Sequence, residues 1–200
     1  MTNAKDIFLD KNLRTGGFYE LSIQVCPSLD NEPIRHYSDF IWSLKNVEGP
    51  FDLDFNSVKV DIENNEHNGI LQLDNFTIPF MTYNIREIEP IDSGFNWFDI
   101  CFYTAAIENV FGDEYVTWLE NPKSPLEIDE FMKFILKSLY KIFPFQLAII
   151  DFEVSGQYYL HDLKDKIELM WNHPKFYVGK DNYKHIAESN RQLCKIIEEI

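Results

Sequence analysis

Cysteine, glycine and proline are all scarce in this sequence. The three cysteines, Cys26, Cys101 and Cys194, are too few and too far apart for a disulfide framework or a zinc knuckle. The 8 glycines and 9 prolines are scattered along 200 residues, which excludes a collagen-like or linker-rich protein. Because free cysteine is among the most buried residue types, we expect these thiols to be small hydrophobic groups in a reducing compartment.

Long apolar runs are missing as well. The longest apolar stretches, such as residues 145–150, fall far short of the roughly 20 residues that a helix needs to span a bilayer. The first twelve residues carry four charged side chains and no apolar stretch, which is not the pattern of a secretory signal. We therefore expect a soluble, cytoplasmic protein.

The common catalytic motifs are also absent. The sequence holds no Gly-x-Gly-x-x-Gly or Walker loop, no Gly-x-Ser-x-Gly elbow, no His-Glu-x-x-His helix and no Cys-x-x-Cys pair. The five histidines are dispersed. These absences argue against the common nucleotide, hydrolase and zinc chemistries, and we expect neither a cofactor nor a metal site. They leave open an enzyme whose site is assembled from distant residues.

Negative charge is what the chain has in excess, and it is concentrated in the middle. Asp and Glu number 33 against 18 Lys and Arg, a net charge of −15. Residues 51–130 alone carry −14, whereas residues 1–50 carry −2 and residues 131–200 carry +1. A polyanion gains nothing from counterion release on nucleic acid and is repelled by anionic lipid, so we expect neither partner. Complementary fields favour a basic protein instead.

The first half of the chain, residues 1–103, is predicted to be rich in strands, with one early helix. Residues 18–26 alternate between apolar and polar side chains as a strand does. Apolar residues at helical spacing after Pro33 predict a helix that stops at Gly49-Pro50. Three or four antiparallel strands are expected over residues 57–89, with Pro79 at an edge or a break.

The second half, residues 104–200, is predicted to be rich in helices around one central strand. The capping box that begins at Ser124 opens a striped helix that ends at Pro144. Residues 145–152 are apolar on both faces, which is typical of a buried central strand. Apolar stripes predict two closing helices, over residues 160–170 and 183–197.

Hydrophobic residues make up 45% of the chain, which is ample for a packed core. No repeat or long linker divides the sequence. We therefore predict a single α+β domain over residues 1–200, with a mostly antiparallel, mixed sheet and helices packed mainly on one face.

Asp151 and Glu153 form the clearest candidate for catalysis. They share one face of the predicted central strand near its carboxyl end, where ligand sites are common. Two such carboxylates could divide acid and base roles or hold Mg²⁺ through oxygen. The alternative is that the strand simply emerges into solvent there, which we favour because the same spacing recurs elsewhere in this acidic chain.

A second candidate is a binding surface in the acidic middle of the chain. Large aromatic side chains supply buried contact area at interfaces, and carboxylates offer paired acceptors to Arg. For any single residue, a place in the core or on a solvated rim is the simpler interpretation. As a set they predict a partner-binding surface of Trp97, Asp99, Glu108, Asp113, Glu114, Tyr115 and Trp118.

These observations favour a non-catalytic interaction protein over an enzyme. In size, charge and lack of catalytic motifs the chain is similar to the small acidic immunity proteins that neutralise bacterial toxins. That similarity implies an inhibitor that binds and occludes a basic partner such as a toxin. Two alternatives stay open: a metal-assisted hydrolase that uses Asp151 and Glu153, and a structural or adaptor subunit.

Overall fold

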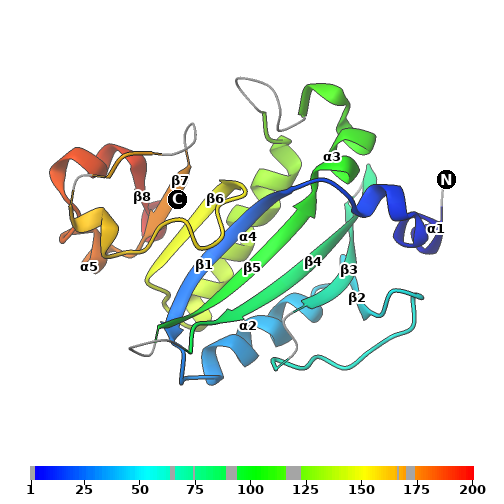
Figure 1. Cartoon of the computed structure of the whole chain (residues 1–200), viewed down its shortest axis with the longest axis horizontal. Helices are drawn as coiled ribbons and strands as arrows, with labels where there is room; N and C mark the ends of the chain where they lie inside the picture. The colour runs from blue at the N-terminus through cyan, green and yellow to red at the C-terminus, as the bar shows by residue number, and fades with distance from the viewer. Residues whose placement is uncertain are drawn as a thin grey trace.

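An eight-stranded sheet forms the centre of the molecule (Figure 1). The computed structural model describes residues 3–63, 66–73, 75–88, 94–115, 123–165, 167–169 and 174–200. The strand order is β2-β3-β4-β5-β1-β6-β7-β8, with all neighbours antiparallel except β7 and β8. The strands are β1 (Phe18–Pro27), β2 (Val47–Phe51), β3 (Glu66–Leu73), β4 (Phe76–Arg86), β5 (Phe95–Tyr103), β6 (Leu147–Phe152), β7 (Lys175–Val178) and β8 (Cys194–Ile196). The predicted α+β class and mixed sheet are confirmed.

The two longest helices cover one face of this sheet. The α-helices of the described residues are α1 (Ala4–Leu9), α2 (Glu32–Trp42), α3 (Thr104–Phe111), α4 (Leu126–Ile142) and α5 (Lys180–Tyr183). Tyr37 of α2 packs its ring 5.7 Å from that of Phe98, and Phe131 of α4 lies 6.2 Å from Phe102. Figure 1 shows α4 behind β1 and β5. Helices packed mainly on one face are therefore confirmed.

The opposite face of the sheet is covered only in part. At the β6–β7 end, Leu147 and Phe176 belong to a second apolar cluster that includes Val154 and Leu163 from the segment after β6. At the other end, Phe8 of α1 is fully buried beside the rings of Phe51 and Phe55. The central strands between these two covers carry polar side chains.

The local sequence signals predicted the extent of α4 correctly. The helix runs from Leu126 to Ile142 and stops before Pro144, as predicted. Its first turn differs from the predicted capping box, because Pro125 occupies the N-cap without a side-chain cap. Ser124 instead lies 3.4 Å from the Lys175 ammonium, which donates to its hydroxyl. Ser124 thus contacts a side chain of β7 and does not cap the helix that it precedes.

Pro79 lies inside β4 rather than at a break. It faces Ile70 of β3, whereas pairing between β4 and β5 starts one residue later, at Phe80. Proline has no N–H to donate, so it is tolerated where the strand has only one bonded neighbour. The expectation of local edge character was correct, although β4 as a whole is internal.

The strand predicted over residues 58–62 is not formed. Those residues make no ladder, and only Ser57 bridges to Phe51. The strand that pairs with β3 is β2, which includes the Gly49-Pro50 pair expected to end a helix. α2 stops earlier, at Trp42.

The two closing helices predicted over residues 160–170 and 183–197 are wrong. Where described, these segments form short 3₁₀ turns, Asp162–Lys164, Glu188–Leu193 and Ile197–Glu199, and the strand β8. β7 was missed, and β6 is therefore one of three strands in the second half. A strand edge offers unpaired backbone groups, and the run after Pro174 satisfies them by pairing with β6. No helix among the described residues is long and apolar enough to cross a membrane.

Candidate functional site

The polar face of β1 is buried in the middle of the sheet. Glu20, Ser22 and Gln24 alternate with apolar residues, as the sequence predicts, yet they are 3%, 0% and 0% exposed. In the sheet register Glu20 lies between Cys101 of β5 and Asp151 of β6. Neighbouring strands therefore enclose side chains that the alternation alone would place in water.

A cavity of about 440 Å³, here called the sheet-face recess, opens over Glu20 on the face opposite α4. It brings together four carboxylates that are far apart in the sequence. It is lined by Phe18, Glu20, Glu66, Met81, Tyr83, Ile85, Asp99, Cys101, Tyr103, Glu153 and Ser155. No lysine or arginine is among these lining residues. The recess is thus a concentrated negative site with partly aromatic walls.

Ser155, just after β6, connects the two buried carboxyl groups. Its N–H donates to Glu20 Oε1 over 2.7 Å, and its hydroxyl donates to Asp99 Oδ2 over 2.6 Å. Burial, followed by the charge of Asp99, raises the pKa of Glu20 to about 8. Burial likewise raises the pKa of Asp99 to about 6. The pair therefore retains protons in a pH range where exposed carboxyls are ionised.

Several buried polar atoms on this face have no hydrogen-bond partner. They include Asp99 Oδ1, Ser22 Oγ and Gln24 Nε2. Ser22 lies directly opposite Asp99 in the register, and Gln24 is the next residue on the same face. Buried polar groups are normally paired with protein atoms or water, so these atoms are positions that a water molecule or a polar ligand can satisfy.

The predicted catalytic pair is only partly brought together. Glu153 lines the recess, adopts a positive φ of 52°, and accepts the N–H of Phe18 over 2.6 Å. Asp151 lies opposite Glu20 in the register and accepts the N–H of Phe152 over 2.8 Å. Among the residues that the structure describes, no group of three or more His, Cys, Asp or Glu side chains is placed to hold a metal ion.

The described residues of the predicted binding surface are divided between the buried recess face of β5 and the exposed segment that follows it. Trp97 and Asp99 are each 1% exposed, inside β5 on the recess face. Trp97 donates its indole N–H to Glu87 over 3.0 Å. Both are therefore unable to offer the exposed contact that the sequence suggested, because the segment after β6 covers them: the Tyr159 ring lies edge-on 5.2 Å from that of Trp97, and Ser155 donates to Asp99.

The remaining members follow β5 on α3 and the short turn after it. Glu108, Asp113 and Glu114 are exposed, and Glu114 pairs with Lys123 over 3.0 Å. Tyr115 packs its ring 5.9 Å from Phe111. Trp118 lies outside the described residues. This part of the predicted surface stays a prediction.

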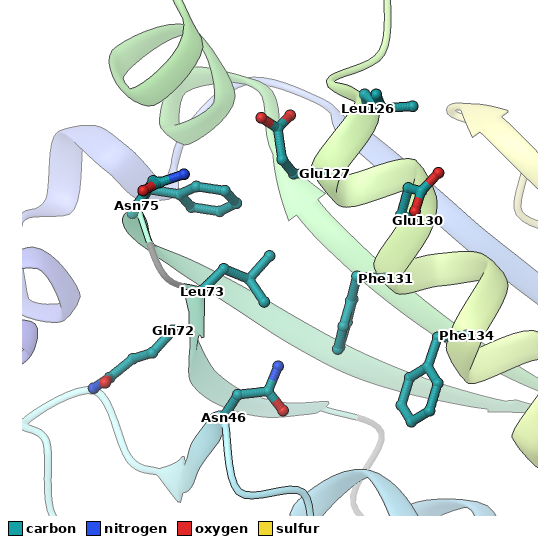
Figure 2. A pocket seen from close by; sticks show the side chains of 10 residues that line it. Asn46, Gln72, Leu73, Asn75, Leu126, Glu127, Glu130, Phe131 and Phe134 are labelled. Carbon is teal, nitrogen blue, oxygen red and sulfur yellow. The ribbon is translucent and has the colours of Figure 1, made fainter.

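A groove of about 610 Å³, here called the α4 groove, lies on the helix-covered face (Figure 2). Figure 2 shows Phe131 and Phe134 projecting from α4 into the space between the helix and Leu73 of β3. Asn46, Gln72 and Asn75 lie on the opposite side of that space. The groove therefore has apolar side chains on both sides, with carboxylates added along α4 and amides added along the strand side.

The edge of the α4 groove that is formed by α4 itself carries acidic side chains and exposed apolar side chains. Leu126 is 66% exposed and Phe134 is 51% exposed. Glu127 and Glu130 are exposed beside them, and no lysine or arginine of the described residues forms an ion pair with either. The groove thus combines exposed apolar area with unpaired negative charge.

The residues at the centre of both sites were not predicted from the sequence. Glu20, Ser22 and Gln24 were assigned to a solvated face, but the segment after β6 lies over that face, with Ser155 N–H donating to Glu20 and Leu160 N–H donating to Gln24. Leu126 and Phe134 sit on the helix that was predicted best. Phe134 is an apolar residue outside the apolar stripe that faces the core, and this position on α4 was the sequence signal for an exposed aromatic ring.

Comparison with protein-family models, with curated proteins and with solved structures gives no match for this chain. Support for a function comes from the geometry of these residues.

Proposed function

We propose that this protein is a non-catalytic interaction protein of the inhibitor or immunity type, which binds a basic segment of a partner protein in the α4 groove. The observation that carries the proposal is the pairing of exposed apolar side chains, Leu126 and Phe134, with the unpaired carboxylates of Glu127 and Glu130.

The energetics of interfaces support this pairing. A few well-packed aromatic and apolar side chains usually supply most of the binding free energy, and Phe134 has half its surface to bury. The carboxylates at the edge add selectivity, because they accept paired hydrogen bonds from Arg and repel acidic competitors.

The charge of the whole chain supports a basic partner. A net charge of −15 attracts positively charged proteins over distances of about one Debye length and speeds their association. Inhibition would follow from steric occlusion, with the protein covering the functional surface of its partner. No chemistry by this chain is required.

Affinity capture from the native organism with matched variants tests the proposal. The wild type, the groove variant Glu127→Lys/Glu130→Lys and the control variant Glu188→Lys/Glu199→Lys are compared at about 0.05 M and about 0.5 M NaCl. Glu188 and Glu199 are exposed and lie near the C-terminus, away from the groove. The control therefore has the same net charge as the groove variant.

We expect the wild type and the control to retain one stoichiometric basic protein at low salt and to release it at high salt. The groove variant should retain at most about a tenth as much, since charge reversal at an interface costs several kcal/mol. Equal retention by all three proteins, or capture of an acidic partner, would overturn the proposal.

A further inference from the structure

We propose that the sheet-face recess is a separate binding site for an organic cation, namely an ammonium or guanidinium group. The recess lies on the face of the sheet opposite α4, so it is distinct from the α4 groove. Its ligand is defined by the unpartnered carboxylate oxygen of Asp99, the aromatic walls and the four convergent carboxylates.

The unpartnered oxygen is the first reason. Asp99 is 1% exposed, its Oδ2 accepts from Ser155, and its Oδ1 forms no hydrogen bond of good geometry, although the Ser22 hydroxyl and the Ile23 N–H lie near enough to lower the pKa of the carboxyl. Leaving a buried acceptor unpaired costs free energy, and an N–H donor from a ligand would remove that cost. A positively charged donor would do so most strongly, because charge-assisted hydrogen bonds are about twice as strong as neutral ones.

The walls of the recess are the second reason. Phe18 and Tyr103 pack with ring centroids 5.2 Å apart, and Tyr83 lines the same cavity. Aromatic faces attract organic cations through their quadrupoles, and they do so best where water is excluded. A volume of about 440 Å³ is in the range of sites for small organic molecules.

The charges around Glu20 are the third reason. The titratable groups that face it are Cys101 and Asp99 of β5, Asp151 of β6, Glu153, and, across the recess, Glu66 of β3, Tyr83 of β4 and Tyr103 of β5. Two cations, Lys11 and Arg14, line an adjoining cavity that shares Glu66 and Tyr103 with the recess, but they do not line the recess itself. A ligand cation would therefore enter a site whose own charges are all negative or neutral.

The protonation of Glu20 and Asp99 is consistent with a site for a cation. With pKa values of about 8 for Glu20 and about 6 for Asp99, the recess without a ligand holds about one proton at neutral pH. A bound cation lowers these pKa values, because an opposite charge favours the ionised carboxyl. Binding should therefore release protons from the recess.

The cationic group has two sources, a free amine or guanidine, or a Lys or Arg side chain of another protein. Isothermal titration at about pH 7 distinguishes them with two probes, agmatine and Nα-acetyl-L-arginine amide. Each titration is repeated in two buffers of different ionisation enthalpy, which gives the number of protons released. The full chain is used throughout.

We expect saturable binding with proton release. Tighter binding of agmatine identifies a free small molecule, and tighter binding of the acetylated amide identifies a protein side chain. Asp99→Asn should weaken binding about tenfold, as expected for loss of a charge-assisted hydrogen bond, and should change the proton count. Asp113→Asn, an exposed carboxylate on the turn after α3, should change neither.

Glu153→Gln provides a second variant in case Asp99→Asn does not fold. Glu153 is exposed at the mouth of the recess, and glutamine keeps an oxygen that can accept the N–H of Phe18. It should weaken binding about threefold or more through loss of charge. Binding of neither probe, or equal affinity in the wild type and in folded Asp99→Asn and Glu153→Gln variants, would overturn the proposal without affecting the α4 groove.

Discussion

Glu20 is the residue whose environment differs most from its sequence pattern. Alternation within β1 assigns it to a polar face, and such a face is ordinarily solvated. In the fold, β5 and β6 flank it and Ser155 donates to it, so that it is 3% exposed. Burial of this carboxyl shifts its pKa, and the shift has a measurable consequence for stability.

The stability of the folded chain should fall as the pH rises from about 6 to about 8. The pKa of Glu20 is raised from 4.5 to about 8 on folding, so the folded state binds more protons than the unfolded state between those values. The stabilisation is complete below pH 4.5 and is lost as pH rises through 8. Over two pH units this amounts to at most about 2–3 kcal/mol. Urea unfolding at a series of pH values measures it.

Glu20→Gln is the matched control for this pH dependence. The amide imitates the protonated acid and keeps an oxygen for the N–H of Ser155. The difference in unfolding free energy between wild type and variant cancels the titration of groups that do not interact with Glu20, such as His67, whose pKa is lowered by burial. Asp99, whose charge raises the pKa of Glu20, titrates together with it and contributes to the difference. That difference should move in favour of the variant as pH rises. A difference that stays constant would contradict the burial argument.

At the scale of elements, α4 could be predicted from its own sequence, whereas β7 could not. α4 has seventeen residues, a clear apolar stripe and a proline after its end, and local signals of that kind accumulate over several turns. β7 has four residues and is defined by its pairing with β6 and β8. A short apolar run cannot be assigned by its own periodicity, because only its partners decide its state.

Phe176→Ala should destabilise the protein by about 3–5 kcal/mol. Phe176 is 0% exposed, and its ring lies edge-on 5.4 Å from Tyr158 in the second apolar cluster. The change removes a fully buried aromatic ring and leaves a cavity between β7 and the segment after β6.

Phe134→Ala is the control for this substitution. Its ring is 51% exposed at the α4 groove, so the same change should cost less than about 1.5 kcal/mol. Urea unfolding measures both variants. Similar losses of stability would show that β7 is not packed as described.

At the scale of the whole molecule, the acidic middle of the chain is distributed rather than gathered. Asp99 is buried, Asp129 pairs with Lys175 over 2.7 Å, and Glu114 pairs with Lys123. The sequence suggested one shared surface, whereas the described residues divide the charge between a recess and a groove on opposite faces. The remaining exposed carboxylates repel one another.

Added salt should therefore stabilise the protein. Raising NaCl from about 0.02 M to about 0.3 M shortens the Debye length to below 10 Å and screens the repulsion. We expect the Tm to rise by about 2–5 °C. A triple variant, Asp54→Asn/Glu108→Gln/Asp113→Asn, removes three exposed charges and should show a smaller rise. Differential scanning fluorimetry measures both, and equal rises would argue against self-repulsion.

The candidate sites were less predictable than the fold. Glu153 was recognised from its position after a central strand, and it does line the recess. Its partners Glu20 and Asp99 come from two other parts of the chain, and no spacing in the sequence joins them to it. Trp97 and Asp99 look like surface residues in an acidic segment, but Tyr159 and Ser155 of the segment after β6 cover them.

The sequence by itself determined the α+β class, the strand β1, the helices α2 and α4, and the central strand β6. These depend on periodicity, prolines and turn residues, which act between residues close together in the chain. The tertiary structure alone decided the order of the strands, the pairing of β7, and the burial of one polar face of β1. Those features depend on hydrogen bonds and packing between different segments of the chain. Ala148 pairs with Tyr177, and Glu20 hydrogen-bonds with Cys101 and Ser155, which lie 81 and 135 residues further along the chain.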